Sequence, residues 1–278
     1  LIGTSTKGLF VCDMNMKVQR QLTTRTPGLH LLGNSISTIY EDSNGTLWVG
    51  SGLSGLYRIN FEKEEMVTYH KGNSILTSNS VRAISELRGM LLIGTFDGLY
   101  TIDLSTNSFW KHTDASLEKG NLSHFSIYSL FVDRRQNLWI GTYRGGLNAS
   151  SEHYDWFQSF CIQNKKLSYD MVTAVVSQKE RLYVGLDGGG LNIYDVKNDK
   201  LLKYTTHNSG ISGDNLLSLS VDDDFAWLGI YGKGLSRYSL SGHTFKNYVL
   251  PPVKDKESAN RIWQIKDDGE GNIWIIAE

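Results

Sequence analysis

Seven loop residues of this chain carry aromatic rings or charges at positions where the surrounding sequence pattern does not require them. They stand between pairs of strand-like segments, and they combine rings that stack on apolar faces with side chains that hydrogen-bond as ions. Such a set suits the binding of a carbohydrate or of a partner domain. The alternative is a solvated polar rim without a ligand. The seven are Phe96, Asp97, Tyr143, Arg144, Asp187, Tyr231 and Lys233.

A catalytic or metal-binding constellation is not visible in the sequence. The seven histidines show no HxxxH or HxH spacing, and only His30 and His124 fall near the loops just described. Asp222-Asp223-Asp224 suggests calcium, but it stands at a turn between strands, where aspartate is ordinary. No glycine-rich segment with a Lys-Ser or Lys-Thr precedes a helix, which argues against a phosphate-binding loop. We therefore expect no catalytic residue, no metal site and no cofactor in this region.

A short apolar segment that ends in glycine recurs along the whole chain. It is Trp48-Val49-Gly50 in its second copy and Trp139-Ile140-Gly141 in its fourth, and in the last copy isoleucine replaces the glycine. The marker positions are separated by 47, 44, 47, 44, 44 and 47 residues, and this regularity identifies a repeat protein. The markers are Gly3, Gly50, Gly94, Gly141, Gly185, Gly229 and Ile276.

Each repeat contains four strand-like runs. In the second repeat these are residues 36–40, 46–49, 55–60 and 66–69, and Asp42-Ser43-Asn44-Gly45 supplies a turn between the first two. No long segment shows the 3.6-residue apolar period of a helix. Four short antiparallel strands in about 45 residues are typical of a β-propeller blade. The sequence therefore predicts an all-β fold, a β-propeller of four-stranded antiparallel blades.

The phase of the repeat sets the expected number of blades. The chain opens and stops inside second strands, so both terminal blades are incomplete. We count five four-stranded blades, a first blade of about three strands and a last of about two. Seven blades is the preferred number, and six is the alternative if the end strands merge into one closing blade. Residues 1–278 are thus interpreted as a single propeller domain and as a fragment of a longer sensor.

Composition and charge disfavour several classes of protein. With 28 Lys and Arg against 29 Asp and Glu, the net charge is −1, which disfavours nucleic-acid binding. No window approaches the ~18 consecutive apolar residues of a membrane helix, so we expect no membrane insertion by this region. Cys12 and Cys161 do not form a disulfide framework, and we expect both to be free thiols.

One recurring position is expected to serve packing. The large residue two positions before each marker should pack between neighbouring blades, because packing repeats from unit to unit whereas a sugar-stacking site is asymmetric. This set is Leu1, Trp48, Leu92, Trp139, Tyr183, Trp227 and Trp274. The marker glycine is interpreted as permitting either close approach of blades or a turn with positive φ. A second recurring apolar residue precedes the first strand, at Leu32, Leu76, Leu122, Leu167 and Ile211.

The repeat resembles a known family. The segment from Asp42 to Gly50, followed by Gly55-Leu56-Tyr57-Arg58-Ile59-Asn60, resembles the two-component regulator propeller repeat. The segment 137–142 followed by Gly145-Gly146-Leu147 is a second clear copy, and residues 182–191 and 271–275 are weaker ones. The resemblance implies the periplasmic sensor region of a bacterial hybrid two-component histidine kinase/response regulator in the inner membrane.

The same resemblance implies partners that lie outside this chain. They are a neighbouring propeller, a small β-sandwich, a membrane helix and cytoplasmic kinase and receiver modules, with the full-length receptor a homodimer. It also implies that glycan-derived oligosaccharides are sensed. The motif itself marks blades and names no ligand residue. Two other functions stay open: a protein-interaction scaffold without a small ligand, and a propeller polysaccharide lyase or hydrolase.

Overall fold

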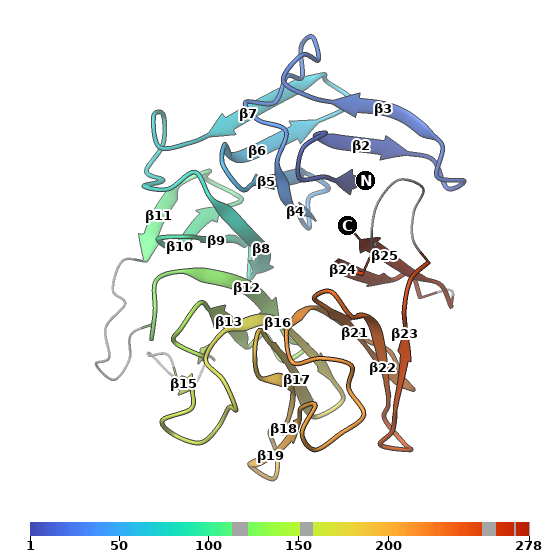
Figure 1. The fold of residues 1–278 in the computed structure, drawn as a ribbon. Coiled ribbons are helices and arrows are strands. Elements are labelled where there is room, and N and C mark those ends of the chain that lie inside the picture. The colour runs from blue at the N-terminus through green and yellow to red at the C-terminus, as the bar shows by residue number, and fades with distance from the viewer. Residues whose placement is uncertain (113–121, 151–157, 252–259, 270, 278) are drawn as a thin grey trace. The chain divides into compact units, whose positions relative to one another are not determined.

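A computed structural model describes residues 1–112, 122–150, 158–251, 260–269 and 271–277 (Figure 1). Within these ranges the chain forms 25 β-strands and no helix. By contact clustering it splits into two compact units, Leu1–Leu117 with Phe125–Leu138 and Glu118–His124 with Trp139–Glu278. The expected all-β class is confirmed.

Unit 1 contains three antiparallel sheets, in each of which the strands follow the order of the chain. The first sheet is β1 (Ile2–Gly3), β2 (Leu9–Cys12) and β3 (Val18–Leu22). The second is β4 (Ile36–Glu41), β5 (Leu47–Ser51), β6 (Gly55–Asn60) and β7 (Glu65–Tyr69). The third is β8 (Val81–Leu87), β9 (Met90–Thr95), β10 (Gly98–Asp103) and β11 (Phe109–His112), and β12 (Ile127–Val132) follows it.

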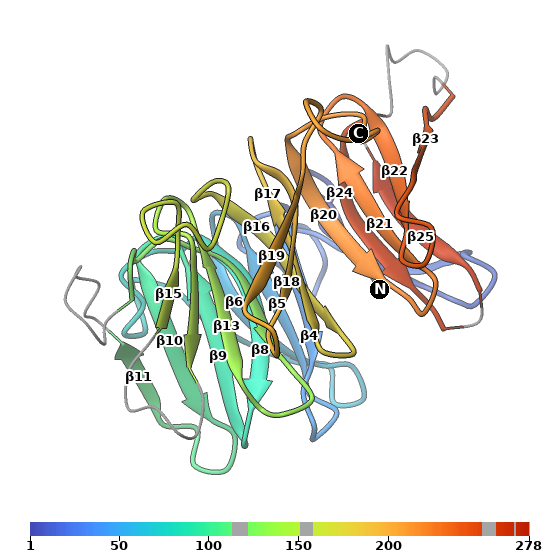
Figure 2. The same ribbon diagram turned by 90° about the horizontal axis from the view of Figure 1, so that it is seen from below.

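Unit 2 repeats the same arrangement (Figure 2). It begins with β13 (Leu138–Thr142), β14 (Leu147–Ser150) and β15 (Gln158–Phe160), which with β12 make four strands for the fourth repeat. Two complete sheets are β16 (Val172–Gln178), β17 (Arg181–Leu186), β18 (Gly190–Asp195) and β19 (Lys200–Tyr204), and β20 (Leu216–Val221), β21 (Phe225–Ile230), β22 (Gly234–Ser239) and β23 (Phe245–Tyr248). A two-stranded sheet of β24 (Ile262–Asp267) and β25 (Ile273–Ala277) ends the chain. The strand counts per repeat agree with the predicted incomplete terminal blades, and about seven blades are consistent with them.

The core lies between consecutive repeats. Trp48, only 1% exposed, belongs to a buried cluster whose other members come mostly from the next repeat, such as Val81, Ile93 and Tyr100. Its indole Nε1 donates to Asp42 Oδ2 at 2.8 Å, so the polar atom of the buried ring is satisfied. Trp139 is 5% exposed and packs on Phe160. The predicted packing between blades is confirmed for Trp48, and Trp139 is buried against an outer-strand residue of its own sheet.

The packing prediction is wrong at the two ends of the series. Leu1 is 50% exposed and Trp274 is 43% exposed. Both belong to the sheets with fewer than four strands, in which less neighbouring surface is available to cover a ring or a leucine. Trp227 is intermediate, half-buried against Ile262 and Ile265.

The marker glycine serves close approach. A Cβ on Gly50 would lie 2.7 Å from Val81 Cγ1, in the first residue of the next blade's innermost strand. Gly3, Gly94 and Gly229 face the corresponding residues Ile36, Ile127 and Ile262 at 2.5 to 2.8 Å. None of these four glycines has a positive φ, so of the two predicted roles the structure supports the first.

One of the predicted apolar positions is displaced by a residue. Leu76, Leu122, Leu167 and Ile211 are buried, whereas Leu32 is 49% exposed and the buried residue is Leu31. In all five cases the buried residue precedes the first residue of the innermost strand by five positions, and Leu32 precedes Ile36 by four. The two free cysteines agree with prediction.

A buried polar position, not foreseen from the sequence, recurs at the second or third residue of the third strand. Asn192 is fully buried; its Oδ1 accepts a hydrogen bond from Ser168 N at 2.9 Å, and its Nδ2 donates to Ser168 Oγ at 2.6 Å. Tyr57, Tyr100, Asn148 and Ser236 accept the corresponding backbone hydrogen bond in their repeats. This side chain fastens the loop that enters the first strand of its own blade.

Replacing Asn192 by alanine should destabilise the protein by about 1–3 kcal/mol, because the Ser168 backbone N–H is left without its acceptor. Asn198→Ala, at an exposed turn, is the matched control and should change stability by less than about 0.5 kcal/mol. Urea denaturation followed by circular dichroism measures both. Equal midpoints for the two variants would contradict the proposed role of Asn192.

Candidate functional site

The predicted site residues lie at one edge of the sheets, which we call the mouth edge. At this edge the second strand turns into the third, and the loop from the preceding blade enters the first strand. In five of the described repeats a backbone hydrogen bond ties the start of the third strand to the entering loop of the next blade. These bonds are Gly8 N to Asn34 O (2.9 Å), Gly55 N to Asn79 O (2.8 Å), Gly146 N to Asp170 O (2.9 Å), Gly190 N to Asp214 O (2.9 Å) and Gly234 N to Asn260 O (3.1 Å).

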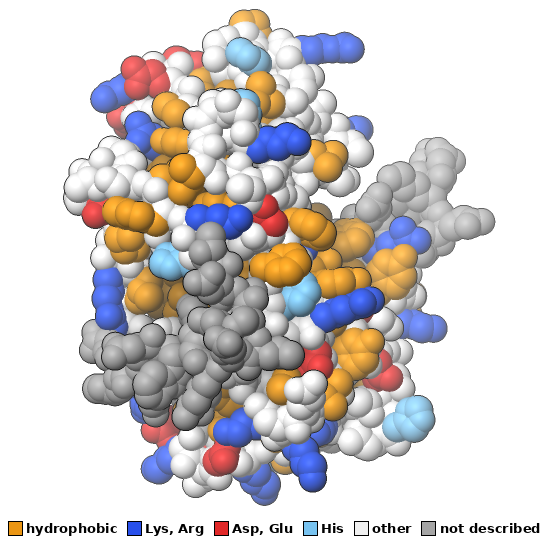
Figure 3. Space-filling view, turned by 90° about the vertical axis from the view of Figure 1, so that its left-hand side faces the viewer, with side chains coloured by type: hydrophobic (Ala, Val, Ile, Leu, Met, Phe, Trp, Pro, Cys, Tyr) orange, Lys and Arg blue, Asp and Glu red, His pale blue; other side chains and the backbone are white. Residues whose placement is uncertain are grey.

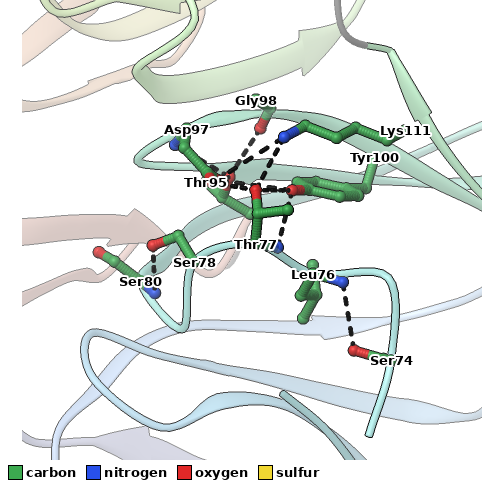
Figure 4. Close-up of polar contacts among 10 residues, drawn as sticks. All are labelled: Ser74, Leu76, Thr77, Ser78, Ser80, Thr95, Asp97, Gly98, Tyr100 and Lys111. Carbon is green, nitrogen blue, oxygen red and sulfur yellow. Dashed lines mark hydrogen bonds and ion pairs between the residues drawn. The ribbon is translucent and has the colours of Figure 1, made fainter. Parts of the chain in front are cut away.

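In unit 1 the turn between β9 and β10 carries Phe96 and Asp97, and the two side chains differ in their surroundings. Asp97 accepts a hydrogen bond from Thr77 Oγ1 and lies 2.9 Å from Thr95 Oγ1 (Figure 4). The Lys111 ammonium lies 3.9 Å from the Asp97 carboxylate and donates to Thr77 Oγ1 at 2.7 Å. The Asp97 carboxylate is therefore held by its own blade. Phe96, in contrast, is 50% exposed.

In unit 2 the turn between β13 and β14 carries Tyr143 and Arg144. The Arg144 guanidinium lies 5.1 Å from the Tyr143 ring centre, and the His124 ring meets the same tyrosine edge to face at 6.4 Å. Burial and the positive charge of Arg144 both lower the pKa of His124 below its usual range. The cluster therefore keeps a neutral imidazole at neutral pH.

This lowered pKa has a consequence for stability. Between the lowered folded-state pKa and the usual value of about 6.5, the unfolded chain binds a proton at His124 that the folded chain does not. We therefore expect the melting temperature to fall as the pH is lowered from 7.5 to 5.5, and His124→Gln to remove part of that dependence. His112, which burial shifts in the same direction, should account for a further part. Identical pH profiles of wild type and His124→Gln would contradict this.

In unit 2, Asp187 and Tyr231 both form hydrogen bonds with Asn215. Asn215 Nδ2 donates to Asp187 Oδ1 at 2.5 Å, and the Tyr231 backbone N–H donates to Asn215 O at 2.9 Å. The Tyr231 ring is 46% exposed, and the Arg261 guanidinium lies 5.1 Å from its centre. Lys233 is exposed in the same turn between β21 and β22.

Several mouth-edge residues were not singled out from the sequence. Phe125 and Tyr169 follow the buried apolar residue of an entering loop, and they are 46% and 42% exposed. Arg82 and Arg261 lie on or next to an innermost strand and pack on exposed rings. The signal that could have found them is a large or charged residue where other repeats carry small polar ones.

This arrangement suits recognition. Exposed rings at the mouth edge can stack on the apolar face of a sugar, and the adjacent guanidinium groups can donate to its oxygens. Within the described ranges no group of three or more His, Cys, Asp or Glu side chains is placed to hold a metal ion. Asp222 of the candidate calcium segment instead caps its own turn and accepts a hydrogen bond from Trp227 Nε1 at 2.9 Å.

The surface drawn in Figure 3 carries Lys and Arg side chains interspersed with acidic and hydrophobic ones. This mixture accords with the net charge of −1. A search for membrane-crossing helices among the described residues finds none of sufficient length and hydropathy.

Comparison with known proteins supports the fold and the repeat. Two structures of the extracellular domain of one B. thetaiotaomicron protein, BT4673, described in one case as a one-component system and in the other as a hybrid two-component system, match at TM-score 0.76. Their identities are 20% and 17%, and the alignments cover 98% and 99% of this chain but 35% and 37% of theirs. The chain thus spans about a third of the length of these structures.

A virginiamycin B lyase from Staphylococcus aureus matches at TM-score 0.70 and 13% identity, over 96% of this chain and 83% of its own. At such identities the likeness shows the propeller fold alone. A comparison with curated proteins finds no match to this chain. The family model of the two-component regulator propeller matches residues 30–52 and 123–144. The chain is therefore a β-propeller in which residues 30–52 and 123–144 match the two-component regulator propeller repeat.

Proposed function

We propose that this chain is the sensor propeller of a hybrid two-component receptor and that it lies outside the cytoplasm, in the periplasm. The observation that carries the proposal is the match to two-component regulator propeller repeats in two separate blades. The propeller neighbour BT4673, described in one of its structures as the extracellular domain of such a system, supports the same location. A histidine kinase, a neighbouring propeller, a β-sandwich and a dimer partner would then belong to the rest of the receptor, and this region would not be an enzyme.

The proposed ligand is an oligosaccharide released from a complex glycan, bound at the mouth edge. Within unit 1 the half-exposed ring of Phe96 offers a stacking surface beside Arg82, and within unit 2 that of Tyr231 offers one beside Arg261. Each stacking contact or charge-assisted hydrogen bond contributes about 1–3 kcal/mol to the free energy of binding. We therefore expect the isolated propeller to bind the oligosaccharide with a dissociation constant in the millimolar to micromolar range.

The test is binding of a panel of oligosaccharides to the 278-residue chain, followed by signalling in the full-length receptor. The double variant Tyr143→Ala with Tyr231→Ala should weaken binding without a comparable loss of stability. Trp110→Ala, which removes a 46%-exposed ring from the outer strand β11, is the control and should bind like wild type. If folding, binding and signalling are all unchanged in the double variant, the recognition surface lies elsewhere.

Two other functions are distinguished by the same panel. Formation of a defined complex with a protein and no glycan binding would favour an interaction scaffold. Release of product from any glycan would favour a lyase or hydrolase, a class that occurs on the propeller fold in the virginiamycin B lyase.

A further inference from the structure

Among the six innermost strands that the structure describes, β8 alone has a charged second residue, Arg82; the others have Ser37, Tyr128, Thr173, Leu217 and Trp263. In β4 and β16 the second residue is Ser37 or Thr173, whose hydroxyl lies within hydrogen-bond distance of a carbonyl oxygen of its own blade and of one in the next. The second residue of β8 is Arg82, at the same irregularity of strand pairing. Because uncharged side chains of very different size fill this position in the other blades, blade packing does not require a cation there, and the charge of Arg82 needs another explanation.

The side chain of Arg82 packs on two aromatic rings of unit 1. Its guanidinium carbon lies 4.3 Å from the centre of the Tyr128 ring and 5.1 Å from that of Phe96. Nη1 donates to the buried Ser126 Oγ at 3.0 Å. Stacking of this kind fixes the plane of a guanidinium and leaves its edge available for hydrogen bonds.

No carboxylate neutralises this guanidinium among the residues that the structure describes. Asp97, the acidic residue in the β9–β10 turn of the same blade, is engaged by Thr77 and Lys111. In unit 2 the acids of the mouth edge are likewise engaged with neighbouring groups. Asp170 accepts from Ile162 N at 2.7 Å, Asp187 from Asn215 Nδ2 at 2.5 Å, and Asp214 from Thr206 N at 2.7 Å.

From this asymmetry we infer that Arg82 selects a saccharide bearing a carboxylate or a sulfate. The anion receives the donors on the edge of the guanidinium, and the exposed face of Phe96 stacks on the attached sugar ring. A half-buried, pre-oriented guanidinium binds a planar or tetrahedral oxyanion through two hydrogen bonds. This inference rests on the proposed oligosaccharide-sensing function and specifies the chemical class of the ligand.

The test compares tetragalacturonate with α-1,4-galactotetraose, which differ in the carboxylate at C6, and includes a κ-carrageenan tetrasaccharide, which carries sulfate and no carboxylate, to separate sulfate from carboxylate. Titration calorimetry on the 278-residue chain should give tighter binding of at least one acidic probe than of the neutral one. Arg82→Gln should weaken that binding by about tenfold or more. Arg58→Gln is the matched control, because it removes the same charge from a side chain that contacts Asn107 in the β10–β11 turn. This control should alter binding by less than about twofold.

The outcomes separate this inference from the proposed function. Binding of the neutral probe as tight as that of both acidic probes, or full acidic binding by Arg82→Gln, would overturn the role of Arg82 and leave oligosaccharide sensing intact. Absence of binding of all three probes to the wild-type chain at millimolar concentration would count against both. The melting temperature of Arg82→Gln serves as the control for folding.

Discussion

Replacing Trp48 by alanine is expected to lower the free energy of unfolding by about 3–5 kcal/mol. The indole is 1% exposed and belongs to a cluster that joins the second repeat to the third. Truncation leaves a cavity between two blades that cannot collapse without moving whole sheets, and it deprives Asp42 of the donor at Nε1. Urea denaturation followed by circular dichroism measures the loss without relying on the fluorescence of the deleted ring.

Trp274→Ala is the matched control for this prediction. The residue stands at the same position of the repeat, and its Nε1 donates to Asp268 Oδ2 at 3.0 Å, yet its side chain is 43% exposed. The loss of stability should be well below that of Trp48→Ala, because less apolar surface leaves its packing environment. Similar losses in the two variants would show that position in the repeat, and not burial, determines the contribution of the tryptophan.

The fold could be predicted because its determinants repeat. Each marker glycine faces the first residue of the next innermost strand, so the spacing along the chain reflects one spatial contact made many times. The turns between first and second strands are similarly local, as at Asp42, whose Oδ1 accepts from the backbone of Asn44 and Thr46. Local and repeated contacts leave periodic traces in a sequence.

The limits of prediction lie where burial depends on neighbours rather than on residue type. Leu31 and Leu32 have the same side chain, and only the distance to Ile36 determines which one is buried. Trp48 and Trp274 likewise share a motif and differ in the strands around them. At such positions the burial of the side chain depends on how many strands cover it, and this number cannot be inferred from the motif.

The candidate site was predictable as a set of loops but not as a set of contacts. Asp97 and Phe96 are adjacent in sequence, yet the first is engaged by Thr77 and Lys111 and the second is half exposed. The orientation of Arg82 against Tyr128 depends on two strands that are some 45 residues apart in the chain. Side-chain pairings across blades leave no mark in a single sequence.

The second large effect is expected from Gly55→Ala, which should destabilise the protein by roughly 2–5 kcal/mol. Gly55 begins β6 at the mouth edge with φ +94°, a conformation that favours glycine, and its N–H donates to Asn79 O at 2.8 Å. An added Cβ would lie 2.1 Å from the carbonyl oxygen of Tyr69. That oxygen belongs to the backbone of β7, where Tyr69 is paired with Leu56, so relief requires the two strands to separate.

Gly89→Ala separates the cost of the backbone conformation from the cost of the clash. Gly89 has φ +73° in the turn between β8 and β9, and an added Cβ meets nothing within 4 Å. This variant should cost about 1 kcal/mol, the strain of a left-handed alanine alone. The difference between the two losses of stability then measures how rigidly the start of β6, the end of β7 and the loop that enters β8 are joined at the mouth edge. If both variants lose the same stability, β7 moves aside freely, and the mouth edge is too compliant to hold rings and guanidinium groups in fixed positions for a ligand.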